Sequence, residues 1–218
     1  MTTAAAAAAA LREPWESLDR QREAASFGMW LFLASEALFF GGLFLAYAYC
    51  RHLHPEAFAA AGRETEITLG FANSAILLTS GLTMATAAAA SRAGLRWPTF
   101  WLLLATAALG LAFVAVKGFE YAEDLDKGLL PRPGHPEADA AGTALFWSFY
   151  WLMTGLHGIH VLVGVGLILR LAVQGGLMPR SLPLEASPAV EATSLYWGLV
   201  DMMWIFLFPL LYLPGRAG

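Results

Sequence analysis

Long uncharged runs of apolar residues, separated by shorter polar stretches, dominate the pattern of the chain. Five such segments cover about 24–50, 68–91, 98–119, 144–169 and 193–213. A helix needs about 20 residues to cross the hydrocarbon core of a bilayer, and every segment is at least that long. None of them alternates between apolar and polar residues as the strands of a membrane barrel do. The pattern therefore predicts an all-α polytopic membrane protein, built as a bundle of five transmembrane helices.

The connections between the segments fit this architecture. Two of them, "RHLHPEAFAAAGRETE" (51–66) and "AEDLDKGLLPRPGHPEADAAG" (122–142), are polar and interrupted by Pro and Gly, and we expect them to be loops. The connection "RAGLRW" (92–97) is so short that the second and third helices should be antiparallel neighbours. Residues 24–213 then form one transmembrane domain. Residues 1–23 form a flexible tail, because their alanine run is only weakly hydrophobic and lacks the basic start of a secretory signal.

Composition and charge support a membrane protein and exclude several other classes. The chain is 58% hydrophobic and 14% charged, whereas a soluble domain has about 25% charged residues. A net charge of −4 argues against nucleic-acid binding, and a single cysteine excludes internal disulfides and iron–sulfur clusters. Lys and Arg are nearly equal in number on the two sides of the membrane, so the positive-inside rule gives only a slight preference for a cytoplasmic N-terminus.

Glu36 is the only charged residue of the first segment, in "FGMWLFLASEALFFGGLFLAY" (27–47), and its position predicts a depth close to the bilayer midplane. An ionised carboxylate at that depth costs a few kcal/mol or more, so the side chain should carry a proton unless a cation or water is near. Two interpretations stay open. Glu36 is either a neutral acid hydrogen-bonded to a neighbouring helix or a proton-exchanging or regulatory group.

The fourth and fifth segments carry the other polar groups predicted at membrane depth. His157 and His160 are three positions apart and share a helix face, a spacing compatible with a metal. The sequence offers no comparable third or fourth ligand, so we expect interhelical hydrogen bonds instead, with Gly155 and Gly158 allowing a neighbouring helix to approach closely. Asp201 has the same desolvation cost as Glu36, and a histidine of the fourth segment is its expected partner.

The third segment ends in "VKGFEYAED", where Lys117 and Glu120 are three positions apart. We expect an ion pair at the membrane interface, which stabilises little where water reaches it. No phosphate-binding glycine loop, nucleophile–base pair or nucleotide fingerprint is found in the sequence. The residues by themselves therefore predict a membrane scaffold with a few buried polar groups and no catalytic centre.

Four stretches, taken together, resemble one known family. "FGMWLFLASEALFF", "FEYAEDL", "TGLHGIHVLVG" and "YWGLVDMMWIFLFPLLYL" occur in the order found in subunit III of the haem–copper respiratory oxidases. The resemblance covers about residues 24–213. It implies a non-catalytic subunit of a proton-pumping terminal oxidase in aerobic electron transport, located in a bacterial-type cell membrane with a cytoplasmic N-terminus.

The resemblance also implies partners and roles for individual residues. The expected partners are oxidase subunit I, subunit II and membrane phospholipid, with haem and copper held by the partner subunits and no metal on this chain. The subunit would stabilise the complex, bind lipid and support proton uptake. Glu36 matches the family's carbodiimide-reactive intramembrane glutamate. The residues that match its other polar motifs are His157, His160, Asp201, Glu120, Tyr196, Trp197 and Trp204.

Two departures from the family pattern are visible. The chain lacks the first two spans of the seven-helix form, so the lipid cleft of that form is either incomplete or completed by another subunit. Gly198 replaces the histidine usual in "YWHFVD", so a hydrogen bond from that side chain is absent. The electron donor, cytochrome c or quinol, depends on other subunits. Two alternatives stay open, an accessory protein of a nitric oxide reductase and an independent proton or solute carrier using Glu36, His157 and Asp201.

Overall fold

The computed structural model describes residues 17–131, 141–177, 184 and 187–216, and their regular structure is entirely helical. The elements are α2 (Leu18–Leu53), α3 (Pro55–Glu64), α4 (Ile67–Arg92), α5 (Arg96–Asp126), α6 (Ala141–Leu171), the π-helical η1 (Ala172–Leu177) and α7 (Pro188–Tyr212). Five of them, α2, α4, α5, α6 and α7, are long and apolar enough to cross a membrane. The predicted all-α, five-span fold is therefore confirmed. Residues 1–16 of the predicted tail lie outside the described residues.

Local sequence signals set the ends of these helices. Gly94 and Gly128 follow α4 and α5 with positive φ, a conformation that favours glycine. At Gly94 the N–H bonds to the carbonyl of Ser91, and the next N–H bonds to that of Ala90, which is the Schellman pattern of a helix C-terminus. Pro55 and Pro188 begin α3 and α7, where a missing N–H costs no helical hydrogen bond.

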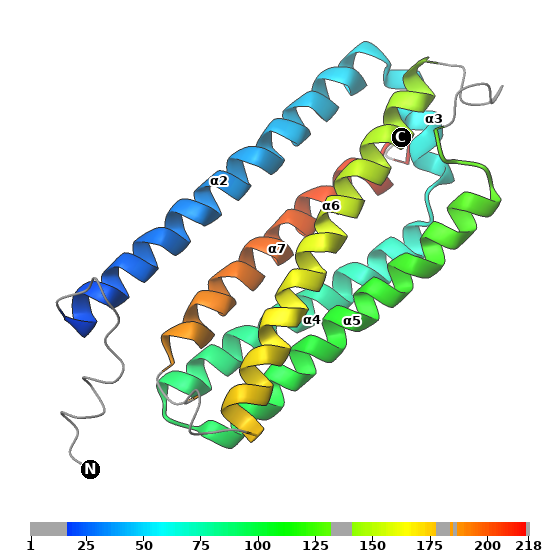
Figure 1. Cartoon of the computed structure of the whole chain (residues 1–218). Helices are drawn as coiled ribbons and strands as arrows, with labels where there is room; N and C mark the ends of the chain where they lie inside the picture. Colours follow the sequence, from blue (N-terminus) through cyan, green and yellow to red (C-terminus); the bar gives the residue numbers. More distant parts are fainter. Residues whose placement is uncertain (1–16, 132–140, 178–183, 185–186, 217–218) are drawn as a thin grey trace. The chain divides into compact units, whose positions relative to one another are not determined.

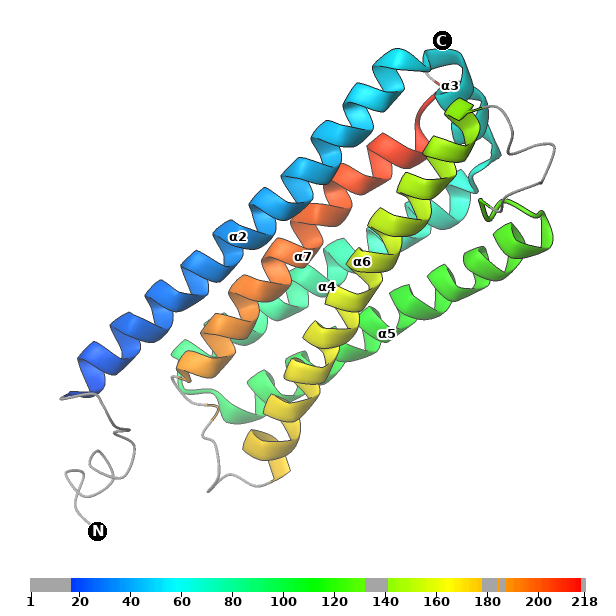
Figure 2. The same ribbon diagram turned by 45° about the horizontal axis from the view of Figure 1, so that its top comes forward.

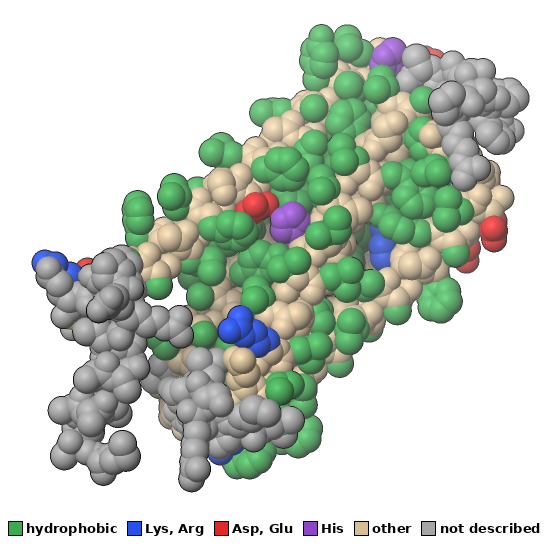
Figure 3. All heavy atoms as spheres, viewed as in Figure 1, with side chains coloured by type: hydrophobic (Ala, Val, Ile, Leu, Met, Phe, Trp, Pro, Cys, Tyr) green, Lys and Arg blue, Asp and Glu red, His purple; other side chains and the backbone are tan. Residues whose placement is uncertain are grey.

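The chain forms two compact units, Met1–Phe39 and Phe40–Gly218. The first contains the beginning of α2, where Phe27, Trp30, Leu31 and Leu38 are exposed. In the second unit, α4 packs against α5 and α7, and α6 packs against the same two helices, so the four form a closed ring (Figures 1 and 2). The tight turn at 93–95 makes α4 and α5 antiparallel neighbours, as predicted. Hydrophobic side chains gather over the outward surface of α5 and α6 in Figure 3, as expected of helices that face lipid.

The connection expected to be a loop over 51–66 is largely the helix α3, so that expectation was wrong. Its alanines have the highest helix propensity, and Pro55 occupies a permitted first position. Phe58 is fully buried, with its ring 5.6 Å from that of Phe146 on α6 and 5.3 Å from that of Tyr47. Burial of this one aromatic side chain fixes α3 across the end of the helical ring, next to the chain's C-terminal residues.

Candidate functional site

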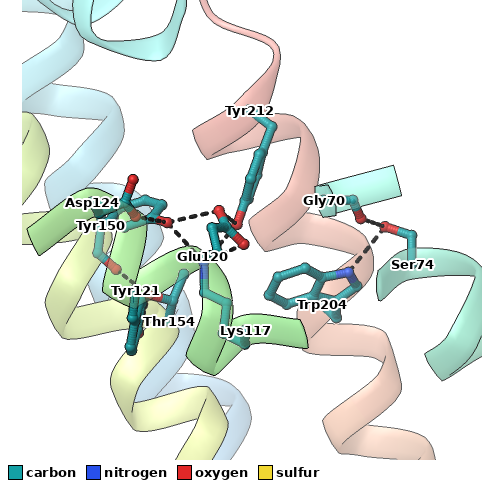
Figure 4. Close-up of polar contacts among 10 residues, drawn as sticks. All are labelled: Gly70, Ser74, Lys117, Glu120, Tyr121, Asp124, Tyr150, Thr154, Trp204 and Tyr212. Carbon is teal, nitrogen blue, oxygen red and sulfur yellow. Dashed lines mark hydrogen bonds and ion pairs between the residues drawn. The ribbon is translucent and has the colours of Figure 1, made fainter. Parts of the chain in front are cut away.

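Five polar side chains are buried together where α5, α6 and α7 meet. Lys117, Glu120 and Asp124 lie on one face of α5, at spacings of three and four residues, and Tyr150 of α6 and Tyr212 of α7 face them (Figure 4). No member is more than 4% exposed. We call these five residues the polar cluster.

The Lys117 ammonium lies at the centre of the polar cluster. It donates hydrogen bonds to the hydroxyl oxygens of Tyr212, at 2.6 Å, and Tyr150, at 2.9 Å. Its Nζ also lies 3.1 Å from Glu120 Oε2 in an ion pair. The ammonium is 4.4 Å from the centre of the Tyr150 ring, a distance at which the aromatic face attracts a cation. One cation thus holds groups from three helices.

The two phenols connect this cation to the carboxylates. Tyr212 OH donates to Glu120 Oε1 at 2.7 Å. Tyr150 OH lies 2.8 Å from the same Oε1 atom and 2.7 Å from Asp124 Oδ2. The second oxygen of Asp124, Oδ1, is buried and has no hydrogen-bond partner in the described part of the chain. The network can therefore hold and transfer protons between its two carboxyl groups through Tyr150.

A second hydroxyl pair supports the position of Tyr150. The hydroxyls of Tyr121 on α5 and Thr154 on α6 are 2.6 Å apart, and Thr154 also donates to the Tyr150 carbonyl at 2.5 Å (Figure 4). A groove between α5 and α6 reaches the polar cluster here, and it is lined in part by Lys117, Tyr121, Thr154 and Gly155. The cluster thus lies just beneath the outer surface of the bundle between α5 and α6.

Lys117 and Glu120 do not form the water-exposed interfacial ion pair of little value that the sequence predicts. The two side chains are 5% and 0% exposed, so water does not screen their interaction. Asp124, Tyr150 and Tyr212 were not identified at all as members of a site. One sequence pattern could have predicted the polar cluster: Lys117, Glu120 and Asp124 are spaced so that they share one face of an otherwise apolar helix.

His157 and His160 occupy different environments although they share a helix. His157 is 1% exposed, with its ring centroid 5.5 Å from that of Phe113 and 5.2 Å from that of Trp204. Neither of its ring nitrogens has a hydrogen-bond partner among the described residues, so the interhelical hydrogen bond expected for it is not observed. His160 Nδ1 pairs with the Leu156 carbonyl of its own helix at 2.8 Å.

Asp201 faces α4 and not α6. Its Oδ2 lies so close to Gly81 that a methyl group there would overlap it, and its Oδ1 has no partner in the described ranges. The expected contact with a histidine of α6 is therefore not observed. The large buried indoles of Trp197 and Trp204, a turn away on either side, contact α6 at Gly164 and His157. Asp201 lies instead beside a small pocket between α4 and α7, which Trp204 also lines.

The aromatic motif residues of α7 join it to its neighbours. Trp197 Nε1 donates to Ser80 Oγ at 3.2 Å, and Trp204 Nε1 donates to Ser74 Oγ at 3.0 Å, so both indoles are bonded to α4. Tyr196 OH donates to the His160 carbonyl of α6 at 3.0 Å. These three residues contribute interhelical hydrogen bonds and packing. Glu36 lies in the other compact unit, on α2, and is partly buried.

Comparison with known proteins identifies the family. A family model described as cytochrome c oxidase subunit III matches residues 19–216. The chain belongs to the cytochrome c oxidase subunit III family. A cytochrome c oxidase subunit 3 of Thermostichus vulcanus is 34% identical, over 87% of this chain and 87% of the relative. One from Synechocystis sp. is 37% identical over 86% and 74% of the two chains. A quinol oxidase subunit 3 of Bacillus spizizenii is 30% identical over 88% and 87%.

The predicted family is thereby confirmed, and the oxidase-subunit interpretation holds over the reductase accessory protein and the independent carrier. Family members named for cytochrome c and for quinol both match most of the chain, so the similarity leaves the electron donor open. Gly198, at the position where the resemblance implied a histidine, is exposed on α7, and a side chain there would point into open space.

Proposed function

We propose that this membrane protein is the non-catalytic subunit III of a proton-pumping haem–copper oxidase in aerobic electron transport. The observation that carries the proposal is the family match over residues 19–216, which includes all five candidate spans. Because a subunit 3 belongs to a larger complex, the chain has partner subunits. Subunit I and subunit II are the partners we propose, and phospholipid would cover the apolar outer faces of the helices.

Haem and copper belong in this proposal to the partner subunits. A haem–copper centre uses several histidines at membrane depth, whereas the spans of this chain contain His157 and His160 and otherwise carry only His52 near one end. The packing supports a scaffold. The indoles of Trp197 and Trp204 are buried and hydrogen-bonded between helices, an arrangement that rigidifies the bundle. The role of this chain is then to stabilise the complex and support its proton uptake.

We further propose a cytoplasmic N-terminus in a bacterial-type cell membrane. The relatives named above are bacterial, and the odd number of spans puts the two termini on opposite sides. The polar cluster, at the end of α5 and α7, would then lie towards the outer side. Cysteines introduced singly at Ser17 and Arg216, and labelled with a membrane-impermeant reagent in intact cells, test this orientation. Labelling at residue 216 alone is expected, and labelling at residue 17 alone contradicts it.

A mild-detergent purification of the tagged chain from its native membrane tests the main proposal. We expect the eluate to show haem absorbance and to consume oxygen, because the catalytic subunit should co-purify. Supplying reduced cytochrome c and a quinol in parallel identifies the electron donor. A tagged, unrelated five-span protein from the same membrane is the control for carry-over. A colourless eluate without oxygen consumption, in two different detergents, contradicts the proposal.

A further inference from the structure

The hydrogen atoms available at Tyr150 do not suffice for its contacts. Its hydroxyl oxygen accepts a hydrogen bond from Lys117 Nζ and lies 2.8 Å from Glu120 Oε1 and 2.7 Å from Asp124 Oδ2. A phenol has a single O–H hydrogen, which two ionised carboxylates could only share in a weaker three-centre contact. A hydrogen on one carboxyl group, donated to the Tyr150 oxygen, gives each of the two short contacts a hydrogen of its own.

The charges of the polar cluster also indicate that it holds one additional proton. It contains one ammonium group and two carboxyl groups, all nearly excluded from solvent. Two buried carboxylates beside one cation leave an uncompensated negative charge, which is strongly unfavourable in a low-dielectric interior. One additional proton makes the cluster neutral.

Lys127 is a second cation that attracts Asp124, but its ammonium is exposed and paired with Glu66 at 2.9 Å, so it lies outside the buried cluster. The Tyr121 hydroxyl bonds to Thr154. His157, the other titratable group close to Lys117, is packed between Phe113 and Trp204. The titratable groups that surround the cluster are thus Glu66 before α4, Tyr121 and Lys127 at the end of α5, and His157 on α6.

The two carboxyl groups differ in how many neighbouring groups stabilise their charged form. Glu120 Oε2 makes no hydrogen bond among the described residues but is ion-paired with Lys117 at 3.1 Å, and Glu120 Oε1 accepts from Tyr212, so the charged form of Glu120 is well stabilised. Asp124 has Tyr150 as its only side-chain hydrogen-bond partner in the described ranges, and its Oδ1 has none. The hydrogens then follow one direction, from Asp124 Oδ2 to the Tyr150 oxygen and from the Tyr150 hydroxyl to Glu120 Oε1.

We propose that the polar cluster is a proton-binding site, which holds one exchangeable proton on Asp124 as a hydrogen bond to Tyr150. Asp124 is in the last turn of α5, and its neighbours Glu123, Leu125 and Asp126 are exposed. The buried carboxyl group is thus close in sequence to the exposed surface at this end of the bundle, and we expect its proton to exchange in D₂O. The site is independent of the proposed oxidase function, because it rests only on atoms of this chain.

Infrared spectroscopy of protonated aspartate tests the proposal. Membranes containing the complex are prepared with aspartate ¹³C-labelled at the side-chain carboxyl, in an Asp201→Asn background. This change leaves Asp124 and the exposed Asp126 as the aspartates of the spans. We expect a carbonyl band of protonated aspartate at neutral pH that shifts in D₂O. The difference between this background and the one with Asp124→Asn added cancels the signals of partner subunits and should contain that band. Absence of the band from the difference overturns the proposal.

A second variant keeps the test decisive if the double variant fails to assemble. Tyr150→Phe in the same background retains the ring and removes the oxygen that accepts the proton's hydrogen bond. The aspartate carbonyl band should then move to higher frequency, because a carboxyl group without a hydrogen-bond acceptor has a stiffer C=O bond. A band that stays at the same frequency overturns the proposal. The matched control is Tyr49→Phe, a 66% exposed tyrosine that should leave the spectrum unchanged.

Discussion

Lys117 Nζ on α5 donates a 2.6 Å hydrogen bond to the hydroxyl of Tyr212, the last residue of α7, although 95 positions separate the two residues in the chain. The bond is buried, and the same ammonium binds Tyr150 of α6. Three of the spans are thus connected through one charged atom. In a bilayer, where apolar side chains gain little by leaving lipid for protein, such polar contacts help to define which helices pack together.

Replacement of Lys117 by Met should destabilise the bundle by about 3–5 kcal/mol, because it leaves buried acids without their cation. Thermal unfolding of the detergent-solubilised complex, followed by helical circular dichroism, measures the loss. The control is Arg92→Met, which removes an ion pair with Glu191 of 3.6 Å between side chains that are 58% and 49% exposed. That change should cost less than about 1 kcal/mol. Equal losses in the two variants contradict the prediction.

Tyr212→Phe removes one hydroxyl from the polar cluster and keeps the ring. Lys117 then loses an acceptor and Glu120 loses a donor, so we expect a loss of about 1–3 kcal/mol in the free energy of unfolding. Denaturant titration of the purified complex measures it. Tyr49→Phe, at an exposed position, should change the stability by less than about 0.5 kcal/mol. Wild-type stability of the Tyr212 variant would show that its hydroxyl is dispensable.

Two glycine-to-alanine changes should have opposite effects on the stability of the bundle. A Cβ at Gly164 would lie 2.7 Å from ring atoms of the buried Trp197, so α6 and α7 would have to separate. We expect Gly164→Ala to destabilise by about 1–3 kcal/mol through overpacking. Gly198→Ala meets open space within α7 and should stabilise by up to about 1 kcal/mol through helix propensity. Melting temperatures of the two variants that shift in the same direction contradict this prediction.

The hydrogen bond between Lys127 and Glu66 predicts a specific pH dependence. Its hydrogen bond to Glu66 raises the pKa of Lys127 above the ordinary value of 10.5. Because the folded-state pKa is the higher one, the stabilisation is fully present below the unfolded-state pKa and disappears as the pH rises through the folded-state pKa. Lys127→Met should therefore be less stable than wild type at neutral pH, by less than about 1 kcal/mol. The two unfolding curves should converge above the folded-state pKa, and a gap that persists there counts against the interaction.

Glu36→Gln tests the role implied by the family's intramembrane glutamate. If Glu36 supports proton uptake, the variant oxidase should pump fewer protons per electron or lose activity earlier during turnover. Oxygen consumption and the acidification of a lightly buffered cell suspension give both quantities. Glu56→Gln, at an exposed position of α3, is the control. Unchanged rate, pumping and turnover lifetime in the Glu36 variant would limit this residue to a structural role.

The local pattern of the chain was sufficient to predict the five spans. In hydrocarbon every backbone polar group must be satisfied within its own segment, so an uncharged run of about 20 residues has few alternatives to a helix. The short connection between α4 and α5 likewise fixed their antiparallel pairing. The prediction failed at α3, where a polar and Pro-containing stretch forms a helix because Phe58 is buried against Phe146. That burial depends on residues far away in the chain.

For the polar residues, too, the sequence predicts some properties, whereas only the packing of the helices decides others. The sequence alone identified Glu36, His157, His160 and Asp201 as polar groups in apolar segments, because the cost of desolvation is a property of each residue and its neighbours in sequence. It placed Glu120 with Lys117 at the membrane interface. It could not assign their partners. Only the packing of the helices brought Lys117 beside Tyr150 and Tyr212, turned Asp201 towards Gly81 on α4, and enclosed His157 between Phe113 and Trp204. Helical periodicity determines which residues share a face, whereas the choice of the facing helix depends on how all the helices pack together.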